Sequence, residues 1–156
     1  MGRLDNKVAV VTGGASNPSL GRAMSIAFAR EGAKVVLTDI DTEGGKKVEE
    51  EILNSSGEAF FIKQDVTSSE DWEEVRNQTL GKYNKIDILV NNAGIAIIKP
   101  LEETSAEEWD KTIDVNLKSV FLGCKTFLPD MRKQKSGSII NISSIAGLVG
   151  LSNCSA

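Results

Sequence analysis

Short apolar runs rich in valine and isoleucine alternate along this chain with longer amphipathic stretches, which predicts strands and helices in turn. The apolar runs begin near Lys7, Lys34, Ala59, Ile86 and Gly137, and successive starts lie 27, 25, 27 and 51 residues apart. Each of the first three intervals leaves room for one strand, one helix and two short loops, and the last for a longer helix. Near-continuous apolar strands separated by helices are typical of a parallel sheet covered on both faces.

The helices between these strands carry recognisable start and stop residues. Gly32 is well placed to end the first helix and Asp41 to cap the second. Ser105 and Glu108 predict a capping box at the start of the fourth, which Pro129 should bend rather than end. The four helices are expected over residues 20–31, 41–56, 68–83 and 105–131. We therefore expect one α/β domain over residues 1–156, with a doubly wound parallel sheet covered by helices on both faces.

Composition narrows the function more than the fold. The chain has 18 Lys and Arg against 22 Asp and Glu, a net charge of −4, which gives no electrostatic support for nucleic-acid binding. It has no histidine, the commonest metal ligand, and Cys124 and Cys154 are too few for a disulfide framework or a zinc site, so no metal is expected. No apolar run is long enough to span a membrane, and residues 1–7 do not resemble a signal peptide. A cytoplasmic protein that acts on a small molecule is expected.

The segment between the first strand and the first helix, here called the glycine-rich turn (residues 12–23), suggests nucleotide binding. Gly13 and Gly21 frame it. Glycines at a strand-to-helix turn let the backbone approach a pyrophosphate, and the helix N-terminus offers free N–H groups. An ordinary strand–helix loop would also contain glycines, so this signal has false positives.

Asp39 strengthens the nucleotide interpretation, because it ends the second strand 18 residues beyond Gly21, near the spacing of a ribose-binding acid. A carboxylate there accepts hydrogen bonds from ribose hydroxyls and repels a 2′-phosphate. The glycine-rich turn has no lysine or arginine before Gly21, and Arg22 follows it. These residues favour NAD over NADP. The alternative is that Asp39 or Asp41 merely caps the second helix.

At this point the chain resembles the classical branch of the short-chain dehydrogenase/reductase (SDR) family. Six motifs carry the resemblance in order: Thr12-Gly13…Gly21, Asp39, Asp65-Val66, Asn91-Asn92-Ala93-Gly94, Asn116 and Ile142-Ser143-Ser144. The resemblance implies an α/β doubly wound parallel-sheet Rossmann fold, in which these residues form the first five strands, in the order 3-2-1-4-5, of a normally seven-stranded sheet. It also implies NAD(P)-dependent interconversion of a secondary alcohol and a ketone, as in 3-oxoacyl reductases or in alcohol and hydroxysteroid dehydrogenases.

The resemblance also assigns roles to single residues. Ser144, with Ser143 as the alternative, would polarise the substrate oxygen, and Asn116 would hold a water in a proton relay. A simpler alternative for Asn116 is a buried amide that bonds to the backbone. Asp65 and Val66 would contact adenine, unless Asp65 only caps a helix. Asn92, Ala93 and Gly94 would line the cofactor, unless Asn91 and Asn92 serve turn chemistry alone. The residues expected to bind the cofactor are Gly13, Ser16, Asn17, Ser19, Leu20, Gly21, Asp39, Ile40, Asp65, Val66, Asn92, Ala93 and Gly94.

Two departures from the family pattern keep other functions open. The glycine-rich turn is two residues longer than usual and has Asn17 or Ser19 at the position of the middle glycine; the spacing of Gly13, Ser19 and Gly21 looks more like that of enoyl-thioester reductases. The chain also ends at Ala156, 12 residues beyond Ser144, just before the family's Tyr-x-x-x-Lys would appear. We therefore expect the N-terminal part of a longer protein, inactive alone and a homotetramer or homodimer when complete. The rival interpretation is a catalytically inactive NAD-binding or interaction fragment.

Overall fold

The computed structural model describes residues 2–154; Met1, Ser155 and Ala156, at the ends of the domain expected over residues 1–156, lie outside the described residues. Five parallel strands form one sheet in the order β3-β2-β1-β4-β5. This confirms the expected α/β doubly wound fold and its strand order. The strands are β1 (Val8–Thr12), β2 (Lys34–Asp39), β3 (Glu58–Lys63), β4 (Ile88–Asn91) and β5 (Ser138–Asn141).

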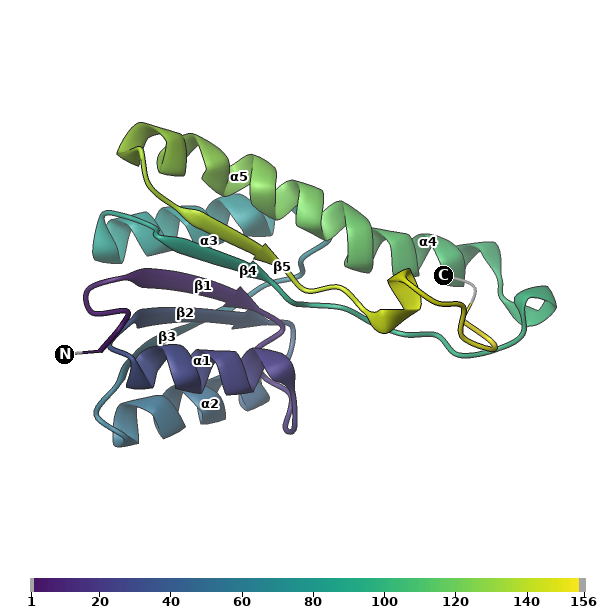
Figure 1. The fold of residues 1–156 in the computed structure, drawn as a ribbon, viewed down its shortest axis with the longest axis horizontal. Coiled ribbons are helices and arrows are strands. Elements are labelled where there is room, and N and C mark those ends of the chain that lie inside the picture. Colours follow the sequence, from purple (N-terminus) through teal and green to yellow (C-terminus); the bar gives the residue numbers. More distant parts are fainter. Residues whose placement is uncertain (1, 155–156) are drawn as a thin grey trace.

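Helices cover both faces of the sheet (Figure 1). Helices α1 (Leu20–Arg30) and α2 (Thr42–Asn54) lie on one face, and α3 (Ser69–Tyr83) and α5 (Ser119–Gln134) lie on the other. Because successive strand residues point to opposite faces, Val11 joins the core under α1 and α2, whereas Val10 joins the core under α3 and α5. No helix within residues 2–154 is both long and apolar enough to cross a bilayer.

Most of the predicted capping residues lie at helix boundaries, and Ser19 is a further cap that was not predicted. The Ser19 hydroxyl accepts a hydrogen bond from Arg22 N and caps α1, and Gly32 beyond its C-terminus has a φ of +88°. Asp41 caps α2 by accepting from Gly44 N, and Ser105 forms the expected capping box with Glu108. The predicted starts of these three helices are confirmed.

The single helix expected over residues 105–131 is wrong in one respect. It consists of α4 (Ala106–Ile113), a π-helical segment (Asp114–Lys118) and α5. Within the π-helical segment the Asn116 side chain bonds to the backbone of Ile95, which a regular sequence period does not reveal. Pro129 lies inside α5, which continues to Gln134, so it does not end the helix, as predicted.

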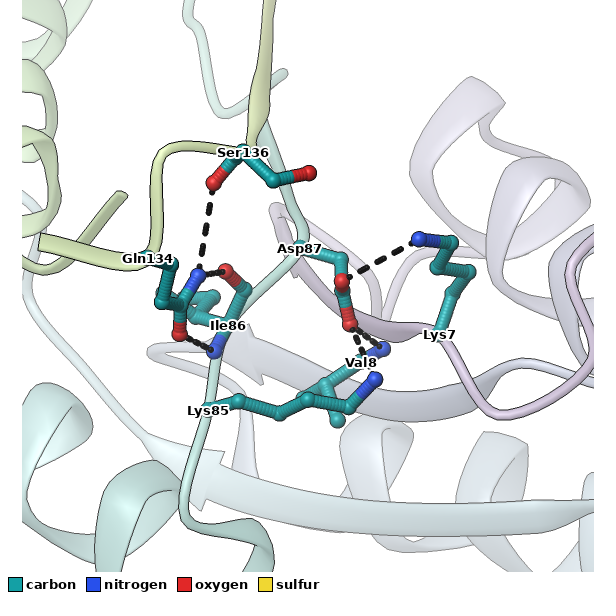
Figure 2. A network of polar contacts seen from close by, with 7 residues as sticks. All are labelled: Lys7, Val8, Lys85, Ile86, Asp87, Gln134 and Ser136. Carbon is teal, nitrogen blue, oxygen red and sulfur yellow. Dashed lines mark hydrogen bonds and ion pairs between the residues drawn. The ribbon is translucent and has the colours of Figure 1, made fainter. Parts of the chain in front are cut away.

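At the amino ends of the strands, Asp87 ties the start of β4 to the start of β1 (Figure 2). Its side chain is 10% exposed and accepts from Val8 N at 2.9 Å, from Lys85 Nζ at 2.9 Å and from Lys7 Nζ at 3.4 Å. Burial opposes ionisation, but the Val8 N–H and the two ammonium groups outweigh it and hold the pKa of Asp87 below its ordinary value. Beside it, the Gln134 side chain donates to Ile86 O and accepts from Ile86 N.

At the opposite, carboxyl end of β1 the backbone passes so close to α1 that glycine is required. Gly13 has a φ of +70°, in the left-handed region that favours glycine. A Cβ at Gly21 would collide with the carbonyl oxygen of Gly13 and lie 2.6 Å from Asn92 Nδ2. The first turn of α1 therefore packs directly on the backbone that follows β1.

We expect Asp87→Ala to lower the free energy of unfolding at neutral pH by about 1–3 kcal/mol, because the Val8 N–H loses its acceptor. The pKa of Asp87 is lower in the folded state than in the unfolded state. Its contribution to the free energy of unfolding is therefore complete at pH values above the ordinary pKa of an aspartate. It disappears as pH falls through the folded-state pKa. Urea denaturation of the full-length protein at neutral pH and in acid measures both effects. Glu43→Gln, which removes an exposed partner of Lys47, should change stability by less than about 0.5 kcal/mol; equal effects of both variants would contradict the prediction.

Gly21→Ala should destabilise the full-length protein by about 1–3 kcal/mol, because the methyl group meets backbone that must move. Gly81→Ala is the matched control, since a Cβ at this glycine of α3 has open space around it. That control should stabilise the protein by roughly 0.5–1 kcal/mol through helix propensity. Thermal unfolding of the two variants compares them; stabilisation by both would show that the close approach at Gly21 is not a constraint.

Candidate functional site

A cleft of about 1030 Å³ lies at the carboxyl ends of the strands. It is formed by the glycine-rich turn, by the segments that follow β2, β3 and β4, and by one face of α4. Of the residues predicted to bind a cofactor, Asn17 and Gly21 do not line it; Asn17 is exposed and Gly21 lies against Gly13. The predicted residues that do line it are Gly13, Ser16, Ser19, Leu20, Asp39, Ile40, Asp65, Val66, Asn92, Ala93 and Gly94.

On the β4 side, hydrogen bonds between Thr12 and Asn92 fix the wall of the cleft. The Thr12 hydroxyl accepts from Asn92 N and Ala93 N, both at 3.0 Å. Asn92 Nδ2 donates to Thr12 O at 2.8 Å and to Gly13 O at 3.2 Å. The polar groups of Asn92 therefore organise the ends of two neighbouring strands, which is more than a local turn requires.

On the β2 side, Asp39 and Asp41 have separate roles. The Asp39 carboxylate accepts from Ala15 N at 2.9 Å and from Asp41 N at 3.1 Å. Asp41, and not Asp39, caps α2 through Gly44 N. The half-buried carboxylate of Asp39 thus lies in the cleft and contacts the glycine-rich turn.

On the β3 side, Asp65 forms a local turn. Its carboxylate accepts from Thr67 N at 2.9 Å and from the Thr67 hydroxyl at 2.7 Å, and it is exposed. The cap of α3 is Ser68, so Asp65 is not the capping residue of that helix. The buried Val66 beside it offers its carbonyl oxygen to Trp72 Nε1 at 2.8 Å, which anchors this segment to the core.

Sequence reasoning missed one buried amide in the cleft lining. Gln64 is 1% exposed, and its Oε1 accepts from the Thr38 hydroxyl at 2.6 Å. Its Nε2 has no hydrogen-bond partner within the described residues. A glutamine between the end of β3 and Asp65 was the available signal.

The α4 wall was also missed. Glu107, Asp110, Lys111 and Asp114 line the cleft, and their spacing of three, one and three residues places them on one helix face. Such a face usually lies in solvent, and only its position beyond the carboxyl ends of the strands distinguishes it (Figure 1). The backbone N–H of Glu107 itself, and after it the Ser105 hydroxyl, hold the pKa of the Glu107 carboxyl below its ordinary value.

The two predicted catalytic residues do not line the cleft. The simpler alternative for Asn116, a buried amide that bonds to the backbone, is correct in its bonds but wrong in its burial. Asn116 is exposed, and its Oδ1 accepts from Ile95 N while its Nδ2 donates to Ile95 O, both at 2.9 Å. Ser144 is exposed, and its hydroxyl accepts from Ala146 N at 3.2 Å. It follows Ile142, which does line the cleft and whose N–H donates to Asn91 O.

Tyr83 has no access to this site. It ends α3, and Lys34 Nζ lies 5.4 Å from the centroid of its ring. Lys34 begins β2, at the end of the sheet opposite the cleft. Burial raises the pKa of the Tyr83 phenol, which keeps it protonated. The only tyrosine of the chain is therefore not a proton donor for the cleft.

The cleft offers hydrogen bonds and charge rather than metal ligands. Its lining carries five carboxylates, from Asp39, Asp65, Glu107, Asp110 and Asp114, and one ammonium group, from Lys111. Within residues 2–154, no cluster of three or more His, Cys, Asp or Glu side chains is arranged to hold a metal ion. The N-terminus of α1 supplies the opposite polarity, since the first N–H groups of a helix have no acceptor within it. The site suits a ligand that is polar and in part anionic.

Comparison with known proteins places this architecture among dehydrogenases. The chain is 44% identical over 150 residues to a cyclopentanol dehydrogenase of Comamonas sp. (96% of this chain, 59% of the relative). It is 43% identical over 146 residues to 2,5-dichloro-2,5-cyclohexadiene-1,4-diol dehydrogenase LinX of Sphingobium indicum (94% and 58%). It is 40% identical over 148 residues to the 3-oxoacyl-[acyl-carrier-protein] reductase FabG of Thermotoga maritima (95% and 59%). The chain spans about three fifths of the length of these relatives.

Solved structures match equally well. A metagenomic short-chain oxidoreductase in complex with NADP superposes with a TM-score of 0.91 at 38% identity (97% of this chain, 68% of that chain). Levodione reductase superposes with a TM-score of 0.93 at 36% identity (98% and 60%). Residues 7–156 match the family described as short chain dehydrogenase. With its sheet order, its cleft and these relatives, the chain belongs to the short-chain dehydrogenase family.

Proposed function

We propose that the complete protein is an NAD-dependent oxidoreductase that interconverts a secondary alcohol and a ketone, and that residues 1–156 are its dinucleotide-binding part. The observation that carries the proposal is the cleft at the carboxyl ends of the strands, with α1 starting beside Gly13 and a carboxylate at the end of β2. Open parallel sheets bind ligands at this edge. The direct packing of Gly21 on Gly13 is the close helix–strand packing that places the start of α1 at this edge.

The chain's own residues provide a group for each part of a dinucleotide. The N–H groups of Leu20 and Gly21, at the start of α1, face no intrahelical acceptor and suit a pyrophosphate. Asp39 suits the adenosine ribose, and Asp65 with Val66 suits the adenine ring. Bound NAD(H) would supply the hydride acceptor or donor for the substrate carbon.

The preference for NAD over NADP rests on charge. The one arginine at the start of α1, Arg22, donates to the Glu51 carboxylate at 2.6 Å, so its guanidinium is already engaged. The cleft lining has five carboxylates against one ammonium group, which disfavours an additional 2′-phosphate near Asp39. The related metagenomic oxidoreductase has NADP bound, so this preference is a proposal for this chain alone.

Ser144 and Asn116 are the proposed catalytic pair by family resemblance. The Ser144 hydroxyl would donate to the substrate oxygen, because it is exposed and uses only its acceptor side for Ala146 N. Asn116 would shape the site through Ile95, whose N–H and carbonyl both bond to its amide.

Since two relatives are dehydrogenases of alicyclic alcohols, we propose a small alicyclic alcohol or ketone as the substrate.

A second candidate function, enoyl-thioester reduction, rests on the longer glycine-rich turn with Ser19 in it. The Ser19 hydroxyl already accepts from Arg22 N as the cap of α1, so its presence has a structural reason as well. Activity with an unsaturated acyl thioester and none with ketones would favour this function.

Self-association of the complete protein is a further proposal. Leu117 and Phe121 are 63% and 60% exposed on one side of the α4–α5 region, and β5 lies at the sheet edge. Exposed apolar surface next to an open strand edge favours a covering partner.

The full-length protein should bind NADH at least about tenfold more tightly than NADPH, because like charges about 4 Å apart near a protein surface repel by about 1–4 kcal/mol. Asp39→Asn should narrow this ratio, whereas Glu74→Gln, at an exposed residue of α3 outside the cleft lining, should leave it unchanged. Fluorescence titration of both coenzymes measures the ratios. Tighter binding of NADPH by the wild type would refute the assignment of NAD.

Ser144→Ala should lower kcat/KM for cyclopentanol oxidation by about 10²–10³-fold, as expected for the loss of one donor to a reacting oxygen. NADH affinity should stay the same, because Ser144 does not line the cleft. Ser143→Ala is the matched control and should retain activity. A loss confined to Ser143→Ala would assign the catalytic role to the neighbouring serine instead.

A further inference from the structure

The glycine-rich turn is held on both sides by residues of neighbouring strands. On the β4 side, Asn92 Nδ2 donates to Gly13 O at 3.2 Å. On the β2 side, Gly14 N donates to Thr38 O at 3.1 Å and Ala15 N donates to Asp39 Oδ2 at 2.9 Å. Two successive amides of the turn therefore bond to two successive residues at the end of β2. Of these two bonds to β2, only the one to Asp39 uses a side chain as its acceptor.

We infer that Asp39 is a positioning residue for the glycine-rich turn, in addition to the ribose recognition proposed above. The inference rests on the proposed dinucleotide site and assigns to one carboxylate both the choice of ribose and the shape of the pyrophosphate site. Ribose binding alone does not require any contact between Asp39 and Ala15.

The geometry leaves the carboxylate free for both tasks. Asp39 Oδ1 accepts from Asp41 N at 3.1 Å, which orients the group, while Oδ2 holds Ala15 N. An ionised carboxylate has about four acceptor positions, so about two remain for ribose hydroxyls. Ala15 is only 4% exposed, so water does not readily replace Asp39 as the acceptor for its N–H.

The length of the turn makes such support useful. Seven residues separate Gly13 from Gly21, and Ser16, Asn17 and Pro18 in its middle are exposed. A longer loop loses more conformational freedom when it is ordered, so an anchor near its start reduces the number of conformations open to the rest. Asp39 provides that anchor 24 residues away in the sequence.

Two substitutions separate the role of the hydrogen bond from that of the charge. Asp39→Asn removes the charge but keeps an oxygen that accepts from Ala15 N. Asp39→Ala removes both. If Asp39 positions the turn, the alanine variant should bind inorganic pyrophosphate at least about fivefold more weakly than the asparagine variant, although both are neutral at this position. Pyrophosphate has no ribose, so ribose recognition does not contribute to this difference.

The experiment is calorimetric titration of the full-length protein with inorganic pyrophosphate. Asp41→Asn and Asp41→Ala form the matched control pair, because Asp41 caps α2 through Gly44 N. This pair should show no comparable difference. Equal pyrophosphate affinities of the two Asp39 variants, with both folded by thermal unfolding, would overturn the inference.

Amide hydrogen exchange at Ala15 provides a second measurement that needs no ligand. Exchange in Asp39→Ala should be faster than in Asp39→Asn, whose remaining oxygen restores protection. Unchanged exchange would also overturn the inference. Failure of the wild type to bind NADH would refute the proposed function, whereas the Ala15 exchange rates would still decide whether Asp39 holds the turn.

Discussion

The hydrogen bonds between Thr12 and Asn92 hold the carboxyl ends of β1 and β4 together, and the rest of the cleft is placed relative to them. The Thr12 hydroxyl receives two backbone N–H groups of the segment after β4, and Asn92 returns two bonds to the backbone after β1. This exchange brings Gly13 against Ala93 and sets the position from which α1 starts. A parallel sheet has no hairpin turns at this edge, so side chains such as these must fix it.

The two ends of the sheet differ in how far their polar groups are hydrogen-bonded within the chain. At the amino end, Asp87 is bonded to Val8 N and two lysines, so its charge is matched within the chain (Figure 2). At the carboxyl end, Asp39 and the start of α1 retain acceptor and donor capacity, and Gln64 Nε2 has no partner within the described residues. The carboxylate at the amino edge is thus matched within the chain, whereas polar groups at the carboxyl edge retain hydrogen-bonding capacity, where a ligand has room.

The outer side of the β4–β5 half of the sheet is apolar and uncovered within the described residues. Leu117 and Phe121 are exposed, and β5 is an edge strand whose residues are mostly exposed. In contrast, Phe127 and Met131, further along α5, are buried against Trp72 and β4. The same helix thus has one apolar face that packs on the sheet and another that is uncovered within the described residues. This agrees with a chain that spans about three fifths of its relatives.

The sequence by itself determined the alternation of strands and helices and most helix starts, because these depend on local patterns: apolar runs, capping side chains and glycines at a turn. The strand order and several of the eleven predicted cleft-lining residues followed from the family resemblance. Only the tertiary structure decided how Asn116, Arg22 and Asp39 use their polar groups. Their partners Ile95, Glu51 and Ala15 lie 21, 29 and 24 residues away in the chain. Pairing over such separations depends on distances between packed elements, which no local period encodes. For the same reason the acidic face of α4 became a wall of the cleft only once α4 was placed beyond the strand ends.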